Sequence, residues 1–311
     1  MNRKLISLAV AAAAVLALNA GDATAAAEGP PPYRVEGFVT MSANETAWLL
    51  SGQNAARPAN GVNVPGCRPS AAHPEPVILL HGLSGNQYNG WSYLGPSLAN
   101  KGYCVYSLNY GGTAPDSFAN GLAPIADSAQ QVAKFIDTVR TQTGAAKVDL
   151  VGHSEGGFLV EYVPKAIPGA SGKVGKVVAL APPTHGTDLF GVISIVDLLN
   201  LRDKISDTCG QACTDVMKDS PIVKELNTGP IAQPGIDYTT IISRYDEAIT
   251  PNASAAINEP GVRNITVQDV CPWDRVGHVG LAFDAGVRTM VENALDPAHP
   301  APVRCDLGLP F

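Results

Sequence analysis

From Pro76 onward, short apolar runs alternate with amphipathic segments along the chain. Apolar runs rich in β-branched residues are typical of buried strands, and the amphipathic segments between them are typical of helices that connect parallel strands. The predicted strands span residues 77–80, 104–108, 148–151, 174–180, 238–243 and 265–270. The pattern therefore predicts an α/β fold, with a mostly parallel sheet and helices on both of its faces.

Two helices are predicted from apolar residues spaced by three and four positions. The first lies between the second and third strands and presents Ile125, Ala129, Val132, Ile136 and Val139. Pro124 is suited to begin this helix and Gly144 to end it. The second is a closing helix after the last strand, with the apolar positions Phe283, Val287, Met290 and Ala294.

Residues 184–234 interrupt the alternation, because this segment is far longer than a crossover between two parallel strands requires. We interpret it as an insertion. Within it, residues 190–201 are apolar on nearly every side. Such a segment is either a buried core helix or a cap over a site, and we favour the cap. A mobile lid is a further alternative.

The first residues have the order of a secretory signal. Arg3 and Lys4 precede an apolar run at 5–18 and the small residues Ala23, Thr24 and Ala25. We therefore expect a signal peptide at 1–25 and a secreted, extracellular protein. A membrane anchor is the alternative, but the run is shorter than the roughly 20 apolar residues that span a bilayer. We expect an extended lead-in at 26–75 and the main domain at 76–311.

Six cysteines in a chain addressed to an oxidising compartment predict three disulfides. Although fifteen pairings exist, proximity along the chain favours Cys67 with Cys104, Cys209 with Cys213, and Cys271 with Cys305. A zinc site is the alternative, but the sequence has neither a CxxC pair nor a second cluster with metal-ligand spacing. We expect no metal and no cofactor.

The formal net charge of the chain is −7. It becomes one unit more negative when Arg3, Lys4 and Asp22 leave with the signal peptide. Nucleic acid and anionic membrane surfaces are therefore not expected as partners.

The strongest chemical motif is Gly152-His153-Ser154-Glu155-Gly156, which matches G-x-S-x-G. A predicted strand leads into it and a helical pattern beginning at Gly156 leaves it, which is the setting of the nucleophile elbow of α/β-hydrolases. Ser154 is therefore the candidate nucleophile. The alternative is a serine that only caps a helix at an ordinary strand-to-helix turn.

A serine nucleophile needs a base, which this fold places after its last strand. His278 lies there. Four histidines come too early for the order serine, acid, histidine: His73, His81, His153 and His185. His299, between Pro297 and Pro300, is better interpreted as part of a surface loop.

The third member of a triad should follow the strand at 238–243, where Asp246 is the candidate. Glu247 and Asp269 are the alternatives. The oxyanion of a tetrahedral intermediate needs backbone donors after the nucleophile and after the first strand, and the amides of Glu155 and Leu83 meet these descriptions.

With these residues identified, the chain resembles the actinobacterial class 2 lipases and, more distantly, the bacterial triacylglycerol lipases. The resemblance covers about residues 76–295 and rests on the segments beginning His81-Gly82-Leu83, Gly152-His153-Ser154, Ala181-Pro182-Pro183, Asp246-Glu247-Ala248 and His278-Val279-Gly280. It implies an α/β-hydrolase fold, a triad of Ser154, Asp246 and His278, and a lid region after Thr184–Thr187. Glu155 departs from the glutamine that such lipases often carry, which implies a more negative local field.

The expected function is that of a secreted lipase or carboxylesterase that cleaves acyl esters through an acyl-enzyme on Ser154. A polyester hydrolase or an acyltransferase would use the same triad, and a catalytically inactive binding protein is the alternative from another class. The expected partners are small-molecule or lipid esters, with transient contact to a lipid interface. We expect a monomer.

Overall fold

The structure is a computed structural model that describes residues 32–36, 54–112, 114, 117–188, 199 and 202–309. The chain divides into two compact units, Met1–Pro32 and Tyr33–Phe311, and the description below concerns the second. The expected signal peptide at 1–25 lies outside the described residues, as does the apolar segment at 190–201 apart from Leu199.

Six strands form one sheet in the described part of the chain, in the order β2-β1-β3-β4-β5-β6, and every neighbouring pair is parallel. The strands are β1 (Val77–Leu80), β2 (Val105–Ser107), β3 (Val148–His153), β4 (Val174–Leu180), β5 (Asp237–Ile242) and β6 (Arg263–Thr266). The prediction of a mostly parallel sheet is confirmed. Because the strands are parallel, the loops that follow β1, β3 and β5 all leave the same edge of the sheet.

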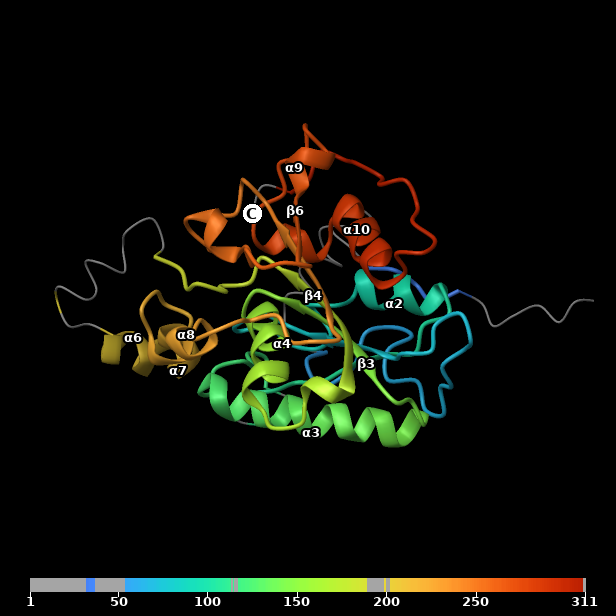
Figure 1. The fold of residues 1–311 in the computed structure, drawn as a ribbon, viewed down its shortest axis with the longest axis horizontal. Coiled ribbons are helices and arrows are strands. Elements are labelled where there is room, and N and C mark those ends of the chain that lie inside the picture. Colours follow the sequence, from blue (N-terminus) through green and yellow to red (C-terminus); the bar gives the residue numbers. More distant parts are fainter. Residues whose placement is uncertain are drawn as a thin grey trace, which may run out of the picture. The chain divides into compact units, whose positions relative to one another are not determined.

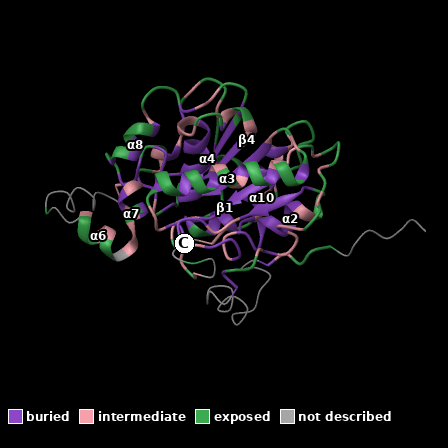
Figure 2. Cartoon of the chain, turned by 90° about the horizontal axis from the view of Figure 1, so that it is seen from below, coloured by how far each residue is buried: buried purple, intermediate pink, exposed green. Residues whose placement is uncertain are grey.

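The sheet has one apolar core on each face. Ile78 and Leu80 of β1 belong to one core, whereas Val77 and Leu79 belong to the other. This division follows from the alternation of side chains along a strand. Both faces of the strands are buried, as Figure 2 shows, which explains why their sequences are continuously apolar.

Helices cover both faces, as Figure 1 shows. The first core contains residues of α3 (Ile125–Thr143) and α4 (Glu155–Ala166). The second contains residues of α2 (Leu94–Asn100) and α10 (Ala285–Leu295). The prediction of helices on both faces is therefore confirmed.

Both predicted helices are present, and α3 begins and ends where the sequence indicates. Its five apolar positions are fully buried, and Gly144 caps its end in the left-handed conformation with φ of 76°. The closing helix α10 begins at Ala285, after Asp284 caps it by accepting a hydrogen bond from the Val287 amide. Phe283 lies just before this helix rather than in it.

The last predicted strand, 265–270, is wrong in its second half. β6 ends at Thr266, and the short helix α9 (Val267–Val270) follows. Val267 and Gln268 are both buried while the next two residues are both exposed, and the alternating faces of a strand cannot give this pattern. The side-chain Nε2 of Gln268 instead donates to Ser243 Oγ and to the backbone carbonyl of Asp274.

The described part of the 184–234 segment forms three short helices: α6 (Arg202–Cys209), α7 (Gln211–Asp215) and α8 (Pro221–Leu226). Ala212 of α7 and Leu226 of α8 are fully buried in the core that α3 and α4 share. This part of the insertion is thus packed against the main domain. The described residues also form three short 3₁₀ helices: η1 (Ser171–Lys173), η2 (Asn252–Ala255) and η3 (Val279–Ala282).

The described residues before β1 contain no helix or strand, but they are fastened to the sheet. Val62 forms an isolated bridge with Val105, and Cys67 is disulfide-bonded to Cys104, the residue directly before β2. All three predicted disulfides are present: Cys67–Cys104, Cys209–Cys213 and Cys271–Cys305.

No described helix combines the length and the hydropathy needed to cross a bilayer.

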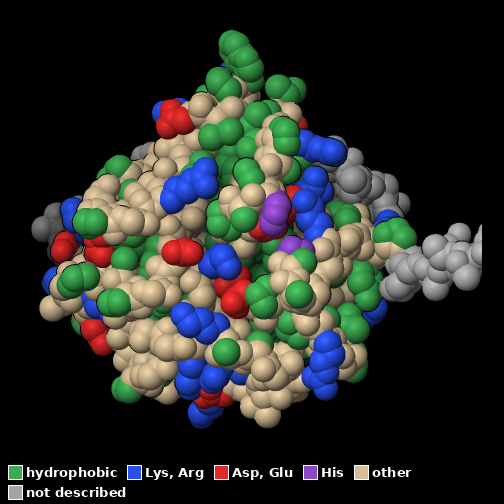
Figure 3. Space-filling view, turned by 45° about the vertical axis from the view of Figure 1, so that its right-hand side comes forward, with side chains coloured by type: hydrophobic (Ala, Val, Ile, Leu, Met, Phe, Trp, Pro, Cys, Tyr) green, Lys and Arg blue, Asp and Glu red, His purple; other side chains and the backbone are tan. Residues whose placement is uncertain are grey.

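On the face drawn in Figure 3, basic side chains are dispersed among acidic, apolar and uncharged ones. Hydrophobic side chains gather toward the top of this face, the end at which α9 lies in Figure 1.

Candidate active site

Ser154 occupies a sharp turn between β3 and α4. Its backbone has φ of 58° and ψ of −121°, a conformation that costs a non-glycine residue roughly 1–3 kcal/mol. The Ser154 amide donates to the Leu180 carbonyl of the neighbouring strand, which helps to hold the turn.

The glycines of the motif are required by close backbone contacts. A Cβ atom on Gly152 would lie 2.0 Å from the Gly156 carbonyl oxygen, and one on Gly156 would lie 2.0 Å from the Leu80 carbonyl oxygen. Neither neighbour can move aside, because both are backbone atoms of packed elements. The turn that carries Ser154 therefore depends on glycine at both positions.

The structure brings the three predicted triad residues together. His278 Nε2 lies 2.8 Å from Ser154 Oγ, and His278 Nδ1 lies 2.9 Å from Asp246 Oδ2. The three side chains come from the loops after β3, β5 and α9, which are far apart in sequence. A hydroxyl, an imidazole and a carboxylate thus form one hydrogen-bonded chain at the sheet edge.

Asp246, rather than either alternative carboxylate, contacts the imidazole. Its Oδ1 accepts hydrogen bonds of 2.8 Å from the amides of Ala248 and Ile249, so the buried carboxylate is held on both of its oxygens. Glu247 instead accepts a hydrogen bond from the backbone amide of His278. Asp269 forms an exposed ion pair with Arg244.

His153 is a contact of His278 that the sequence did not reveal. Its Nε2 lies 2.8 Å from the His278 carbonyl oxygen, and the two rings are 4.9 Å apart. Burial lowers the pKa of His153 to about 3, so the ring is neutral and donates from Nε2. The chain order excluded His153 as the base but gave no sign that it would contact the backbone of His278.

The residues of both predicted oxyanion donors lie beside the serine. Leu83 and Glu155 line the same cavity as Ser154 and His278. In the described part of the chain, neither amide is bonded to a protein acceptor, which leaves both N–H groups free for a ligand. Free amides at the start of a helix and in the loop after β1 are suited to stabilise a negative oxygen.

The side chain of Glu155 lies in the protein interior. It is 1% exposed, and neither of its carboxyl oxygens has a hydrogen-bond partner. Burial raises the pKa of Glu155 well above its ordinary value, which favours the neutral form of this carboxyl group relative to an exposed one. The expectation of a more negative local field stays a prediction.

Two cavities meet at Ser154 and His278. One has a volume of about 370 Å³ and is lined largely by apolar residues of the insertion and of the loop after β5, among them Ile205, Val216, Met217 and Ile249. The other is about 180 Å³ and is lined by the loop after β1 and the start of η3. A molecule bound at the serine can extend in two directions.

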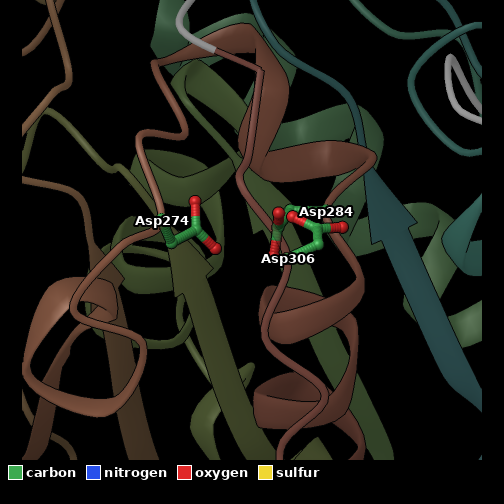
Figure 4. Close-up of side chains that lie close together, drawn as sticks. All are labelled: Asp274, Asp284 and Asp306. Atoms are coloured by element: carbon green, nitrogen blue, oxygen red, sulfur yellow. The ribbon is translucent and has the colours of Figure 1, made fainter.

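Among the described residues, three carboxylates lie close enough together to hold a metal ion: Asp274, Asp284 and Asp306 (Figure 4). None of them belongs to the hydrogen-bonded chain at Ser154. The sequence did not suggest them as a group, because they are separated by up to 32 positions and share no motif.

The family model described as "Lipase (class 2)" matches residues 74–288. A triacylglycerol lipase of Pseudarthrobacter phenanthrenivorans is 33% identical over 131 residues, which are 40% of this chain and 38% of the relative. A triacylglycerol lipase of Burkholderia plantarii is also 33% identical over 131 residues, 40% of this chain and 34% of the relative. The match thus spans little more than a third of each relative.

Among solved structures, lipase B of Aspergillus fumigatus is similar to this chain with a TM-score of 0.56 and 20% identity. The similarity covers 74% of this chain and 54% of the fungal protein. At this level of identity it concerns the fold, and it agrees with an α/β-hydrolase architecture for the parallel sheet.

Proposed function

Since the chain belongs to the class 2 lipase family, we propose that it hydrolyses carboxylic esters of lipids through Ser154, His278 and Asp246. The observation that carries this proposal is the continuous hydrogen-bonded chain from Ser154 Oγ through both nitrogens of His278 to Asp246 Oδ2. This arrangement has the geometry by which a serine hydroxyl is deprotonated at neutral pH.

In the first half of the reaction, Ser154 Oγ attacks the ester carbonyl while His278 Nε2 accepts the hydroxyl proton. Asp246 holds the imidazole with Nδ1 protonated and stabilises the imidazolium that forms. The imidazolium then gives its proton to the departing alcohol. An acyl group remains on Ser154.

In the second half, water takes the place of the alcohol. His278 Nε2 accepts a proton from the water as it attacks the acyl carbonyl, and the proton returns to Ser154 Oγ when the acid leaves. In both halves the amides of Leu83 and Glu155 donate to the oxyanion. Loss of one such donor typically lowers the rate about 10²- to 10³-fold.

The cavities suggest how an ester is oriented. We assign the acyl chain to the 370 Å³ cavity, because its lining is largely apolar, and the alcohol to the 180 Å³ cavity. Simple esters and glycerides of medium chain length are the preferred substrates. A polyester hydrolase and an acyltransferase use the same residues, and they differ only in the alcohol and in the acceptor of the acyl group.

Exposed apolar side chains flank the site and favour contact with a lipid interface. Tyr245 and Val279 are neighbours of Asp246 and His278 in sequence, Val270 ends α9, and Trp273 lies on the loop that leads from α9 to His278. Trp273 is 83% exposed. Three disulfides also favour an oxidising, extracellular location, so we propose that the protein is secreted.

The proposal is tested by labelling the purified protein with a fluorophosphonate and locating the label. We expect the label on Ser154, and we expect Ser154→Ala to lose both labelling and hydrolysis of p-nitrophenyl butyrate, with little change in melting temperature. A well-folded protein that neither reacts nor hydrolyses any ester would favour a binding protein instead. Full activity of the Ser154→Ala variant would show that the nucleophile is wrong.

The substrate class is tested by a series of esters from acetate to long-chain acyl groups, with a triglyceride emulsion and a polyester film. We expect a maximum at medium chain length. Analysis of the products with and without added alcohol distinguishes hydrolysis from acyl transfer, because a transferase would form a new ester in the presence of alcohol.

A further inference from the structure

Three aspartates from separate segments converge beside the loop that carries His278. Asp274 precedes His278 by four residues, Asp284 follows it by six, and Asp306 lies near the end of the chain. One carboxylate oxygen from each lies within 4.8 Å of the other two. Figure 4 shows the carboxylates of Asp284 and Asp306 adjacent to each other, with an oxygen of Asp274 directed toward them.

Two of these carboxylates are buried, and each has an oxygen that faces only the other carboxyl groups. Asp274 is 0% exposed and Asp284 is 5% exposed, and no N–H or hydroxyl group among the described residues donates to the Oδ2 atom of either. The other oxygens are all used by backbone amides: Asp274 Oδ1 by Val276, Asp284 Oδ1 by Val287 and Asp306 Oδ1 by Gly308. The protein thus fixes each carboxyl group through one oxygen and leaves the second oxygen of the two buried ones, Asp274 and Asp284, without a donor.

In the part of the chain that the structure describes, the three carboxyl groups have no basic partner. Within the described residues, no lysine or arginine forms an ion pair with any of the three aspartates. The nearby Arg288 is directed instead to Glu292. Buried carboxylates without a counter-ion are costly, so the cluster needs a bound proton or a bound cation.

We propose that Asp274, Asp284 and Asp306 bind a divalent cation of the calcium class. Calcium takes six to eight oxygen ligands at about 2.3–2.6 Å, so two oxygens on one ion lie up to about 5 Å apart. The 4.8 Å limit of this cluster fits that range. The donors are all oxygen atoms, whereas zinc prefers nitrogen and sulfur and magnesium requires a stricter octahedron with several waters.

The site is accessible from outside. Asp284 and Asp306 line a surface cavity of about 280 Å³, together with Leu307, Gly308 and Leu309. This cavity gives an ion a path to the buried oxygens and provides room for the waters that would complete its coordination. Asp306 is exposed, so the ligand nearest to solvent belongs to the tail.

A cation here would connect three segments that determine where His278 lies. The tail already runs beside the segment before His278, because the amides of Arg275 and Gly277 donate to the carbonyls of Leu307 and Leu309. Cys271–Cys305 joins the same two stretches. The cation adds Asp284, at the start of α10, to this attachment. It acts on structure, and it takes no part in the ester chemistry.

The first experiment measures binding to the purified full-length protein after treatment with EGTA. Calorimetric titration with CaCl₂ at pH 8 is expected to show one equivalent bound, with MgCl₂ at least tenfold weaker. Terbium luminescence excited through tryptophan is an independent signal, because Trp273 directly precedes Asp274. Calcium at about 100 times its dissociation constant should raise the melting temperature by about 5 °C.

The variants Asp284→Asn and Asp306→Asn locate the site. Asparagine can still accept the same backbone hydrogen bonds, so both variants are expected to fold and to bind calcium at least tenfold more weakly. Asp237→Asn is the matched control, since Asp237 is exposed at the start of β5 and outside the cluster. It should bind as the parent does.

Two outcomes would overturn the proposal. Absence of binding and of any calcium-dependent melting shift at 10 mM CaCl₂ would show that the carboxyl groups share a proton instead. Binding that is unchanged in both cluster variants would place the ion elsewhere. Neither outcome depends on ester hydrolysis, so this test is separate from that of the catalytic proposal.

Discussion

The two sides of the candidate active site are held in place by different means. Ser154 is positioned by backbone packing alone, through glycines that allow β3 and α4 to approach each other at the edge of β1. His278 is positioned by polar side chains and cross-links, which include Asp246, Glu247, His153 and the Cys271–Cys305 bond. A local sequence motif can encode the first arrangement, whereas the second requires residues from distant segments.

The largest effect is expected on the histidine side. Asp246→Asn keeps an acceptor for the Ala248 and Ile249 amides but no longer favours the tautomer with Nδ1 protonated, so kcat should fall about 10⁴-fold with little change in melting temperature. Steady-state hydrolysis of a soluble ester measures this. Asp269→Asn, at the exposed alternative, is the control and should be unchanged. Equal losses in both variants would contradict the assignment.

On the serine side, the expected effect is on folding. Gly156→Ala places a methyl group 2.0 Å from the Leu80 carbonyl oxygen and should lower the free energy of unfolding by about 3 kcal/mol or more. Gly172→Ala is the matched control, because a Cβ atom there meets nothing within 4 Å. Urea denaturation measures both. A Gly156→Ala variant as stable as the control would contradict the steric argument.

Removing a cross-link should affect the two sides differently. Two double variants each remove one disulfide: Cys271→Ser with Cys305→Ser, and Cys67→Ser with Cys104→Ser. The loops that they open are of similar length, 34 and 37 residues, so the free energy of unfolding should fall by about 2–4 kcal/mol in each. Only the first pair should also lower kcat, measured well below the melting temperature, because it loosens the attachment of the His278 segment. Equal kcat values in the two double variants would show that the Cys271–Cys305 bond has no particular role in positioning His278.

The smallest effect is expected from Glu155→Gln. Burial raises the pKa of Glu155 in the folded state, whereas the unfolded chain ionises near its ordinary value. At a pH above the ordinary pKa of a glutamate, the folded state keeps a proton on Glu155 that the unfolded chain has lost. The stability of the parent protein therefore falls as pH rises. The glutamine variant has no ionisable group at this position, so this loss of stability with rising pH is absent from it.

The melting temperature of Glu155→Gln, relative to the parent, should therefore increase from pH 4 to pH 8. Its kcat should change less than tenfold, because the oxyanion donor is the backbone amide, which the substitution retains. Parallel melting curves across this pH range would mean that Glu155 is ionised in the folded protein.

Local patterns in the sequence predicted the sheet, α3, α10 and the turn at Ser154, because period and glycine placement are local properties. The disulfide pairing also followed from order along the chain. The end of β6 was missed, since the short helix α9 is fixed by the buried contacts of Gln268 with other segments. His153 and the three aspartates were missed for the same reason: their partners come together only in three dimensions.

The attachment of residues 305–309 beside the His278 segment determines the order in which the two sides of the candidate active site can form during translation. A ribosome completes the turn at Ser154 about 150 residues before it makes this stretch. The turn that carries Ser154 can therefore form early. The segment that carries His278, the proposed base, is attached only after Leu309 has been synthesised. The chain is therefore expected to lack activity toward esters until residues 305–309 have been synthesised and lie beside the His278 segment.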